Sequence, residues 1–307
     1  MTKNKVTIIG AGMVGSTTAF GLIASNLVEC IALIDINKKL AASQVMDLDH
    51  SVPFWGYTDV RVGVEKDLKD SRLVIITGGA AQKKGETRLD LLKKNSEIVK
   101  EWVPRIFKNN PDAIIIMVTN PVDILTNIAI KLYPKKKNQI FGSGTILDTA
   151  RFRHLLGERM KVNPKSVHAY IIGEHGDSEV PLWSTATVGN TPLNKFEKIS
   201  DAEKNKIFEK AKNAAYAIIE GKQATYYAIA AGIVKLAKTV LYDKRTVYAI
   251  SHPLDGRYGI KNVSLSLPAV IGAKGVLRKV DIDMSSQEKN QLKKSARKLL
   301  AAEKALS

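Results

Sequence analysis

The sequence predicts an α/β protein in which a doubly wound parallel sheet is followed by an α+β second half. Short apolar runs rich in Val and Ile recur in the first half, helix-length segments separate them, and this alternation stops near residue 143. Strands that are apolar on both faces are typical of a parallel sheet covered by helices on each side. We therefore expect two domains, residues 1–142 and 143–307.

In the first half, strands are expected at residues 6–9, 31–36, 73–77 and 113–119, with helices at 13–26, 88–109 and 122–133. The last of these helices follows Asn120-Pro121, and proline is favoured at the first helical position. The second half predicts a helix at 145–160, a strand at 167–172, a helical stretch at 202–242 with a break near Gly221, further strands and a final helix. Ser285 and Glu288 have the spacing of a capping box for that final helix.

Composition limits the class of protein. A chain of 307 residues with 45% hydrophobic content can bury a large core without disulfides, and the single cysteine, Cys30, lies in an apolar run that predicts burial. We find neither a bilayer-length apolar stretch nor the pattern of a secretory signal at the N-terminus. We therefore expect a cytoplasmic protein with no membrane partner.

The net charge of +17 would suit a nucleic-acid-binding protein. However, the lysines are scattered, as at residues 135–137 and 293–294, without interleaved aromatic residues. We expect no nucleic-acid partner. A non-catalytic nucleic-acid-binding protein remains the rival from another class, and its binding would weaken steeply with salt.

A dinucleotide site is predicted directly after the first strand. The segment Gly10-Ala11-Gly12-Met13-Val14-Gly15 is a GxGxxG motif at the start of a helix, where backbone N–H groups can hold a pyrophosphate. Asp35 ends the second strand 20 residues after Gly15 (35 − 15), where a carboxylate can bind the ribose hydroxyls. That carboxylate would repel a 2′-phosphate and favours NAD over NADP. The alternative is three turn glycines and an unrelated aspartate.

Four later segments complete a pattern that resembles the lactate and malate dehydrogenase family over essentially the whole chain. They are the glycine-containing loop and helix start at residues 78–90, Thr119-Asn120-Pro121, Leu147-Asp148-Thr149-Ala150-Arg151 and Gly173-Glu174-His175-Gly176-Asp177. The resemblance implies hydride transfer between NAD and a 2-hydroxy acid, without a metal. Reduction of a 2-keto acid needs a proton donor, a cation for the carboxylate and a dry site, and histidine titrates near neutral pH.

The resemblance also implies roles for individual residues. His175 would donate the proton and Asp148 would orient its ring, while Arg151 would bind the substrate carboxylate through its planar guanidinium. Arg88 would polarise the carbonyl when its loop closes. Asn120 would contact both cofactor and substrate, Thr225 would line the pocket and Ile229 would pack on the nicotinamide. Each residue also has a structural alternative, such as Asp148 as a helix-start carboxylate.

Gln82 favours the lactate branch of this family. The malate branch carries an arginine here, which pairs with a second carboxylate, whereas an amide tolerates a methyl group. We therefore expect pyruvate and L-lactate as substrates. Malate or a branched-chain 2-hydroxy acid remains the alternative, and Gln82 would then be an ordinary solvated loop residue.

Arg153 and His168 resemble paired basic residues with which bacterial members of the family bind fructose 1,6-bisphosphate between subunits. The resemblance implies a homotetramer and an activation of this kind, because both side chains can hydrogen bond to phosphate. The alternative is that both are ordinary polar residues.

Overall fold

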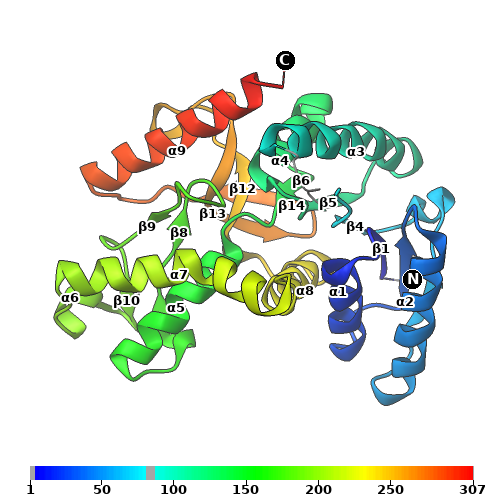
Figure 1. The fold of residues 1–307 in the computed structure, drawn as a ribbon, viewed down its shortest axis with the longest axis horizontal. Helices are drawn as coiled ribbons and strands as arrows, with labels where there is room; N and C mark the ends of the chain where they lie inside the picture. Colours follow the sequence, from blue (N-terminus) through cyan, green and yellow to red (C-terminus); the bar gives the residue numbers. More distant parts are fainter. Residues whose placement is uncertain (1–3, 81–86, 307) are drawn as a thin grey trace.

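The computed structural model describes residues 4–80 and 87–306. Within these residues, nine strands form one sheet in the order β14-β13-β12-β6-β5-β4-β1-β2-β3 (Figure 1). The sheet strands are β1 (Lys5–Ile9), β2 (Cys30–Ile34), β3 (Asp59–Val62), β4 (Leu73–Ile76), β5 (Ile114–Met117), β6 (Ile140–Gly142), β12 (Thr246–Pro253), β13 (Ser264–Gly272) and β14 (Gly275–Lys279).

The six strands from β6 to β3 are parallel, and their order is that of a doubly wound dinucleotide-binding sheet. The doubly wound prediction is therefore confirmed. The predicted strand at residues 31–36 was too long, because β2 ends at Ile34 and Ile36 is fully solvated. The sequence analysis did not identify β3 and β6, which are only four and three residues long.

Helices cover both faces of this sheet. One buried cluster joins the sheet to α3 (Arg88–Asn109), α4 (Val122–Leu132) and α9 (Ser286–Lys304), and a second joins it to α1 (Met13–Ala24), α2 (Lys38–Ser51) and α8 (Tyr227–Leu241). In Figure 1, α3, α4 and α9 lie above the sheet, with α1 and α8 below it. The predicted helix after Asn120 begins at Val122, so Pro121 is its N-cap rather than its first residue.

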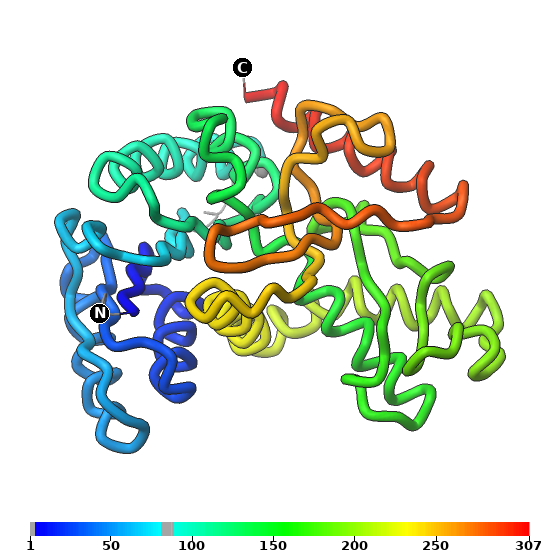
Figure 2. The backbone as a smooth tube through the Cα atoms, turned by 180° about the vertical axis from the view of Figure 1, so that it is seen from behind, coloured from blue at the N-terminus to red at the C-terminus, as the bar shows by residue number. Residues whose placement is uncertain are grey.

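The second half adds a smaller layer at one end of the sheet. It consists of α5 (Ile146–Met160), α6 (Leu193–Phe196), α7 (Asp201–Lys222), β7 (Val167–His168), β8 (Ile171–Ile172), β9 (Val180–Pro181), β10 (Thr187–Val188) and β11 (Thr191–Pro192). A third buried cluster includes Phe152, Leu156 and Ile171. Figure 2 shows this layer, in green, from the opposite side.

One expectation for the second half needs correction. The strand predicted at residues 167–172 is two short strands, β7 and β8, which belong to different small sheets. In addition, β12, β13 and β14 extend the first half's sheet by antiparallel pairing, beginning with Ser251 opposite Gly142. The predicted break near Gly221 is present, because α7 ends at Lys222 and α8 begins at Tyr227.

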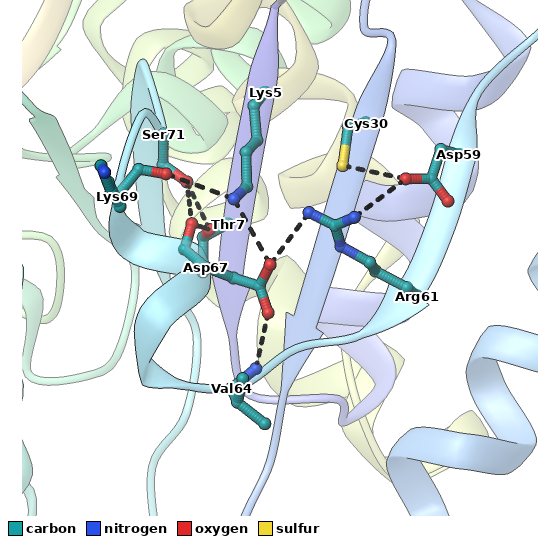
Figure 3. A network of polar contacts seen from close by, with 9 residues as sticks. All are labelled: Lys5, Thr7, Cys30, Asp59, Arg61, Val64, Asp67, Lys69 and Ser71. Carbon is teal, nitrogen blue, oxygen red and sulfur yellow. Dashed lines mark hydrogen bonds and ion pairs between the residues drawn. The ribbon is translucent and has the colours of Figure 1, made fainter.

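A network of ion pairs joins the amino ends of β1, β2 and β3, opposite the glycine-rich turn (Figure 3). Asp67 lies at its centre and pairs with Lys5 Nζ at 3.4 Å and with Arg61 Nη2 at 2.9 Å. Cys30 Sγ donates to Asp59 Oδ2 at 3.5 Å, and burial raises the pKa of its thiol. The predicted burial of Cys30 is therefore confirmed.

Candidate active site

The glycine-rich turn between β1 and α1 is closely packed on two sides and open on the third. A Cβ on Gly10, whose φ is +108°, would lie 2.4 Å from Gly78 N, and one on Gly15 would lie 1.9 Å from Gly10 O. A Cβ on Gly12 would meet nothing within 4 Å. Gly10 and Gly15 are therefore required by packing, while Gly12 faces open space.

The N-terminus of α1 borders this open space. Within the described residues, no side chain caps this helix and its first turn carries no acidic residue. Gly12 and Met13 are exposed and Val14 is half-buried. Unpaired N–H groups at a helix N-terminus attract a negatively charged group, so this turn fits the pyrophosphate of a dinucleotide.

Asp35 follows β2 and braces the glycine-rich turn. Its Oδ2 accepts a hydrogen bond from Ala11 N at 2.7 Å, and its Oδ1 accepts one from Asn37 N at 2.8 Å. Each carboxylate oxygen has a second acceptor position, so Asp35 can also bind a ribose hydroxyl. Spacing alone predicted only the ribose contact, and the bracing role emerges from the structure.

Asp148 connects His175 with Arg151. His175 Nδ1 lies 2.6 Å from Asp148 Oδ2, and Arg151 Nη1 donates to Asp148 Oδ1 at 3.1 Å. Asp148 and Arg151 lie one turn apart on α5, while His175 comes from the loop after β8. The Asp148 side chain is 4% exposed and that of His175 25% exposed, so the imidazole remains accessible beside a buried carboxylate.

Electrostatics favour the charged form of His175. The negative charge of Asp148 raises the pKa of the imidazole to about 9 against the opposing effect of burial. Burial alone would raise the pKa of Asp148, but the charges of His175 and Arg151 outweigh it and hold that pKa below its usual value. The pair is therefore suited to hold a proton and release it to a bound substrate.

Asp123, which the sequence analysis missed, holds the backbone of His175. Asp123 lies in the first turn of α4, and its Oδ2 accepts a hydrogen bond from His175 N at 2.7 Å. Burial raises the pKa of Asp123 to about 6, although the hydrogen bond from the His175 N–H lowers it. Asp123 lies three residues after Asn120, but its contact with residue 175 depends on the tertiary fold.

Asn95 links the loops that follow β4 and β5, and the sequence analysis missed it too. The side chain is 2% exposed, its Oδ1 accepts a hydrogen bond from Ala80 N, and its Nδ2 donates to Asn120 O, both at 2.8 Å. Asn120 itself is exposed at the carboxyl end of the sheet. Asn95 therefore holds the start of the loop after β4 against the turn that carries Asn120.

The remaining predicted pocket residues lie between α7 and α8 or on α8. Thr225 is half-buried in the connection between these helices. Ile229 lies in the first turn of α8 and packs against the buried cluster that Val14 also contacts. Since α8 packs against α1, Ile229 lies on the same side of the sheet as the glycine-rich turn.

Arg153 and His168 occupy neighbouring segments. Arg153 Nε donates to Ala169 O at 2.8 Å, and its guanidinium lies 4.7 Å from the centroid of the Tyr170 ring. His168 is exposed on β7, opposite Thr187. Gln82 lies outside the described residues, and Arg88 is described only as the first residue of α3.

Comparisons with known proteins match both halves of the chain. The model for the NAD binding domain of lactate/malate dehydrogenase matches residues 4–142, and the model for the alpha/beta C-terminal domain of lactate/malate dehydrogenase matches residues 145–306. The chain belongs to the lactate/malate dehydrogenase family. It is therefore an NAD-dependent oxidoreductase, and the expectation of NAD as cofactor is confirmed.

Curated relatives match this chain over nearly their full lengths. The chain is 46% identical to the L-lactate dehydrogenase of Acetivibrio thermocellus over 303 residues, covering 96% of this chain and 95% of the relative. It is 43% identical to L-lactate dehydrogenase 1 of Clostridium acetobutylicum over 305 residues, with 97% of both chains covered.

Solved structures agree with the fold. The minor L-lactate dehydrogenase of Enterococcus mundtii, in a ligand-bound form, matches with a TM-score of 0.96 at 35% identity, covering 100% of this chain and 99% of the other. A lactate dehydrogenase from a Medee basin deep-sea metagenome matches with a TM-score of 0.95 at 37% identity and the same coverage. None of the described helices is long and apolar enough to cross a membrane.

Proposed function

We propose that this enzyme is an L-lactate dehydrogenase that interconverts pyruvate and L-lactate. The main support for this proposal is the Asp148 carboxylate, which binds His175 through one oxygen and Arg151 through the other. An imidazole and a guanidinium on one buried carboxylate support the assignment of His175 as proton donor and Arg151 as carboxylate-binding cation. The names of the curated relatives support lactate as the product. A dehydrogenase of malate or a branched-chain 2-hydroxy acid is the alternative.

In the proposed mechanism, Arg151 binds the substrate carboxylate and fixes its orientation. Asp148 holds Nδ1 of His175, so Nε2 is the atom that passes a proton to the carbonyl oxygen. A nicotinamide cofactor held at the glycine-rich turn would supply the hydride for the C2 carbon of pyruvate, or accept it from L-lactate in the reverse direction. Arg88 polarises the carbonyl, and Asn120, Thr225 and Ile229 shape the pocket.

For the cofactor, we propose contacts with Gly10, Gly12, Met13, Val14 and Gly15 along the pyrophosphate and with Asp35 at the adenosine ribose. The open space at Gly12 and the uncapped start of α1 support this assignment. We also propose the division into a cofactor domain, residues 1–142, and a substrate domain, residues 143–307.

Substrate choice is tested by NADH oxidation with pyruvate, oxaloacetate and branched 2-keto acids. Pyruvate should show the highest kcat/KM. A higher value for oxaloacetate or a branched acid would replace lactate as the proposed product. Replacing Gln82 by arginine should shift the preference toward oxaloacetate, because a new cation would pair with its second carboxylate. An unchanged preference for pyruvate would contradict the role of Gln82.

We further propose that fructose 1,6-bisphosphate activates the enzyme through Arg153 and His168. The position of Arg153 beside residues 169 and 170, next to His168, supports a shared phosphate site. Titration with the sugar bisphosphate should lower the KM for pyruvate, and Arg153→Gln should abolish the effect. A flat titration of the wild-type enzyme would overturn this proposal.

We propose that the enzyme is a homotetramer that reduces pyruvate during fermentation in the cytoplasm. Exposed apolar residues on α1, α2 and the turn after α2 support self-association. Phe54 is 82% exposed, Tyr57 is 95% exposed, and Phe20 and Trp55 stack edge to face at 6.3 Å on the same surface. Analytical ultracentrifugation should give four times the mass of one chain.

A further inference from the structure

A groove of about 710 Å³ lies between the first turns of α7, the N-terminal end of α9 and the segment that contains β9 to β11. Its volume is in the range of small-molecule sites. Neither His175 nor a residue of the glycine-rich turn lines it. Its apolar walls come from Trp183, Leu193, Ile199 and Phe208.

The charged residues of this groove are mainly acidic, in contrast to the chain as a whole. The chain has a net charge of +17, yet the described residues that line the groove include four carboxylates and one lysine, namely Glu179, Asp201, Glu209, Glu288 and Lys204. Lys204 Nζ is bound to Asp201 Oδ1 at 2.8 Å. The groove therefore favours a cationic occupant.

Among the described carboxylates that line the groove, Glu179 is the one with a buried oxygen that lacks a hydrogen-bond partner. Glu288 accepts hydrogen bonds from the N–H and hydroxyl groups of both Ser184 and Ser285, so its oxygens are occupied. Glu179 is 7% exposed, and its Oε1 is buried without a hydrogen-bond partner in the described structure. An unsatisfied buried polar atom is unfavourable, and a ligand N–H group would satisfy it.

We propose that this groove binds an organic cation, an aromatic or alkyl group that carries one ammonium. The apolar part would lie against Trp183 and Phe208, and the ammonium would pair with Glu179. A concave site of this volume fits a small molecule better than the single lysine of a second copy. Cation–π contact with Trp183 would add to the attraction.

Glu179 also connects the groove with the candidate active site. It lies four residues after His175, and the charges that act on it come from His175, from Asp148 and Arg151 on α5, and from Lys212 on α7. On its other side, α9 carries Glu288 and packs against β9. Burial, and then the charge of Asp148, raise the pKa of Glu179 to about 8, so the Glu179 carboxyl group is mainly protonated at neutral pH when the groove is empty. A bound ammonium would release this proton to solvent, and ionised Glu179 would raise the pKa of His175 further.

Calorimetric titration of the free enzyme at pH 7.5 with phenethylammonium chloride tests the proposal without substrate or cofactor. The uncharged analogue 2-phenylethanol should bind at least tenfold more weakly. Glu179→Gln should weaken ammonium binding at least tenfold. Glu209→Gln is the matched control, because it removes an exposed carboxylate from the same groove, and it should change affinity less than threefold.

A second variant keeps the test decisive if Glu179→Gln does not fold. Asn205 is exposed on α7 and lines the groove, so Asn205→Arg should fold and should abolish binding by filling the groove with a competing cation. Equal binding of the ammonium and the alcohol, binding that survives Asn205→Arg, or titration curves explained only by a change in oligomeric state would overturn the proposal. Because the readout is binding, it does not depend on which 2-keto acid the enzyme reduces.

Discussion

At the scale of single residues, Asp148 has the largest influence on the proposed chemistry. One buried carboxylate pairs with two cationic side chains and keeps both in place. Its charge raises the pKa of His175 to about 9, so the imidazole stays protonated through neutral pH. The direction from pyruvate to lactate consumes this proton, and its rate should therefore fall only as the pH rises through about 9.

Asp148→Asn should move this basic limb downward by removing the charge that stabilises the imidazolium. At pH 8, kcat/KM for pyruvate should fall at least about tenfold, because the protonated fraction of an unassisted histidine is small there. A pH profile from 5.5 to 9.5 measures the shift. The same basic limb in both enzymes would contradict the role of Asp148. NADH affinity, which should be unchanged, controls for misfolding.

The same raised pKa has a consequence for stability. A histidine whose folded pKa exceeds its unfolded value stabilises the native state fully below the unfolded pKa, which is about 6.5. This contribution is lost as the pH rises through the folded value of about 9. Urea denaturation should therefore show the wild-type enzyme losing stability between these pH values. His175→Gln should remove this component of the pH dependence.

At the scale of secondary structure elements, Asn95 connects α3 with the loops after β4 and β5. Asn95→Ala would leave Ala80 N and Asn120 O without this partner. We expect a destabilisation of about 1 to 3 kcal/mol and a higher KM for pyruvate. Asn95→Asp is a second comparison, because it keeps the acceptor for Ala80 but replaces the donor to Asn120 with a buried carboxylate oxygen. Wild-type KM values in both variants would argue against a role in loop positioning.

The ion-pair network of Figure 3 joins three strands and the segment after β3. Asp67 pairs with two cations and accepts a hydrogen bond from Val64 N at 3.0 Å. Burial opposes ionisation of Asp67, but this hydrogen bond, Lys5 and Arg61 lower its pKa. An acid with a lowered pKa stabilises the fold above its unfolded pKa, and this contribution is lost as the pH falls through the folded value.

Asp67→Asn should therefore reduce the free energy of unfolding at pH 7 by about 1 to 3 kcal/mol. The difference from wild type should shrink as the pH falls below about 4. Urea unfolding at several pH values measures both effects. Asp59→Asn is the control, since that side chain is 59% exposed and should contribute less than about 1 kcal/mol. A difference between Asp67→Asn and wild type that persists at low pH would contradict the electrostatic explanation.

At the scale of the whole molecule, the proposed self-association would use the exposed aromatic side chains around α1 and the turn after α2. Phe54→Asp should weaken self-association, because it places a charge in the apolar surface formed by α1, α2 and the following turn. Ultracentrifugation at micromolar concentrations should then show lighter species. Leu132→Asp, which changes an exposed leucine at the end of α4, should leave the mass unchanged. Identical masses for Phe54→Asp and wild type would place the interface elsewhere.

Local signals in the sequence predicted most of the first half, including the glycine-rich turn after the first strand. The strands could be predicted because each is apolar on both faces. The glycine-rich turn could be predicted because its glycines follow a strand at fixed spacing. The capping box of Ser285 and Glu288 was predicted in the same way and is present. These features depend on residues within about twenty positions of one another, and periodicity and spacing record such relationships.

The tertiary structure alone decided the contacts between distant residues. Asp123 reaches the backbone of His175 across 52 positions, Asn95 reaches the turn at Asn120, and β12 to β14 complete a sheet begun at residue 5. Short strands such as β3, β6 and β8 owe their position to pairing and burial, which a run of two to four residues does not encode. The sequence therefore determined which chemical groups the chain carries, while packing decided which of them meet, because long-range contacts depend on the whole fold rather than on local pattern.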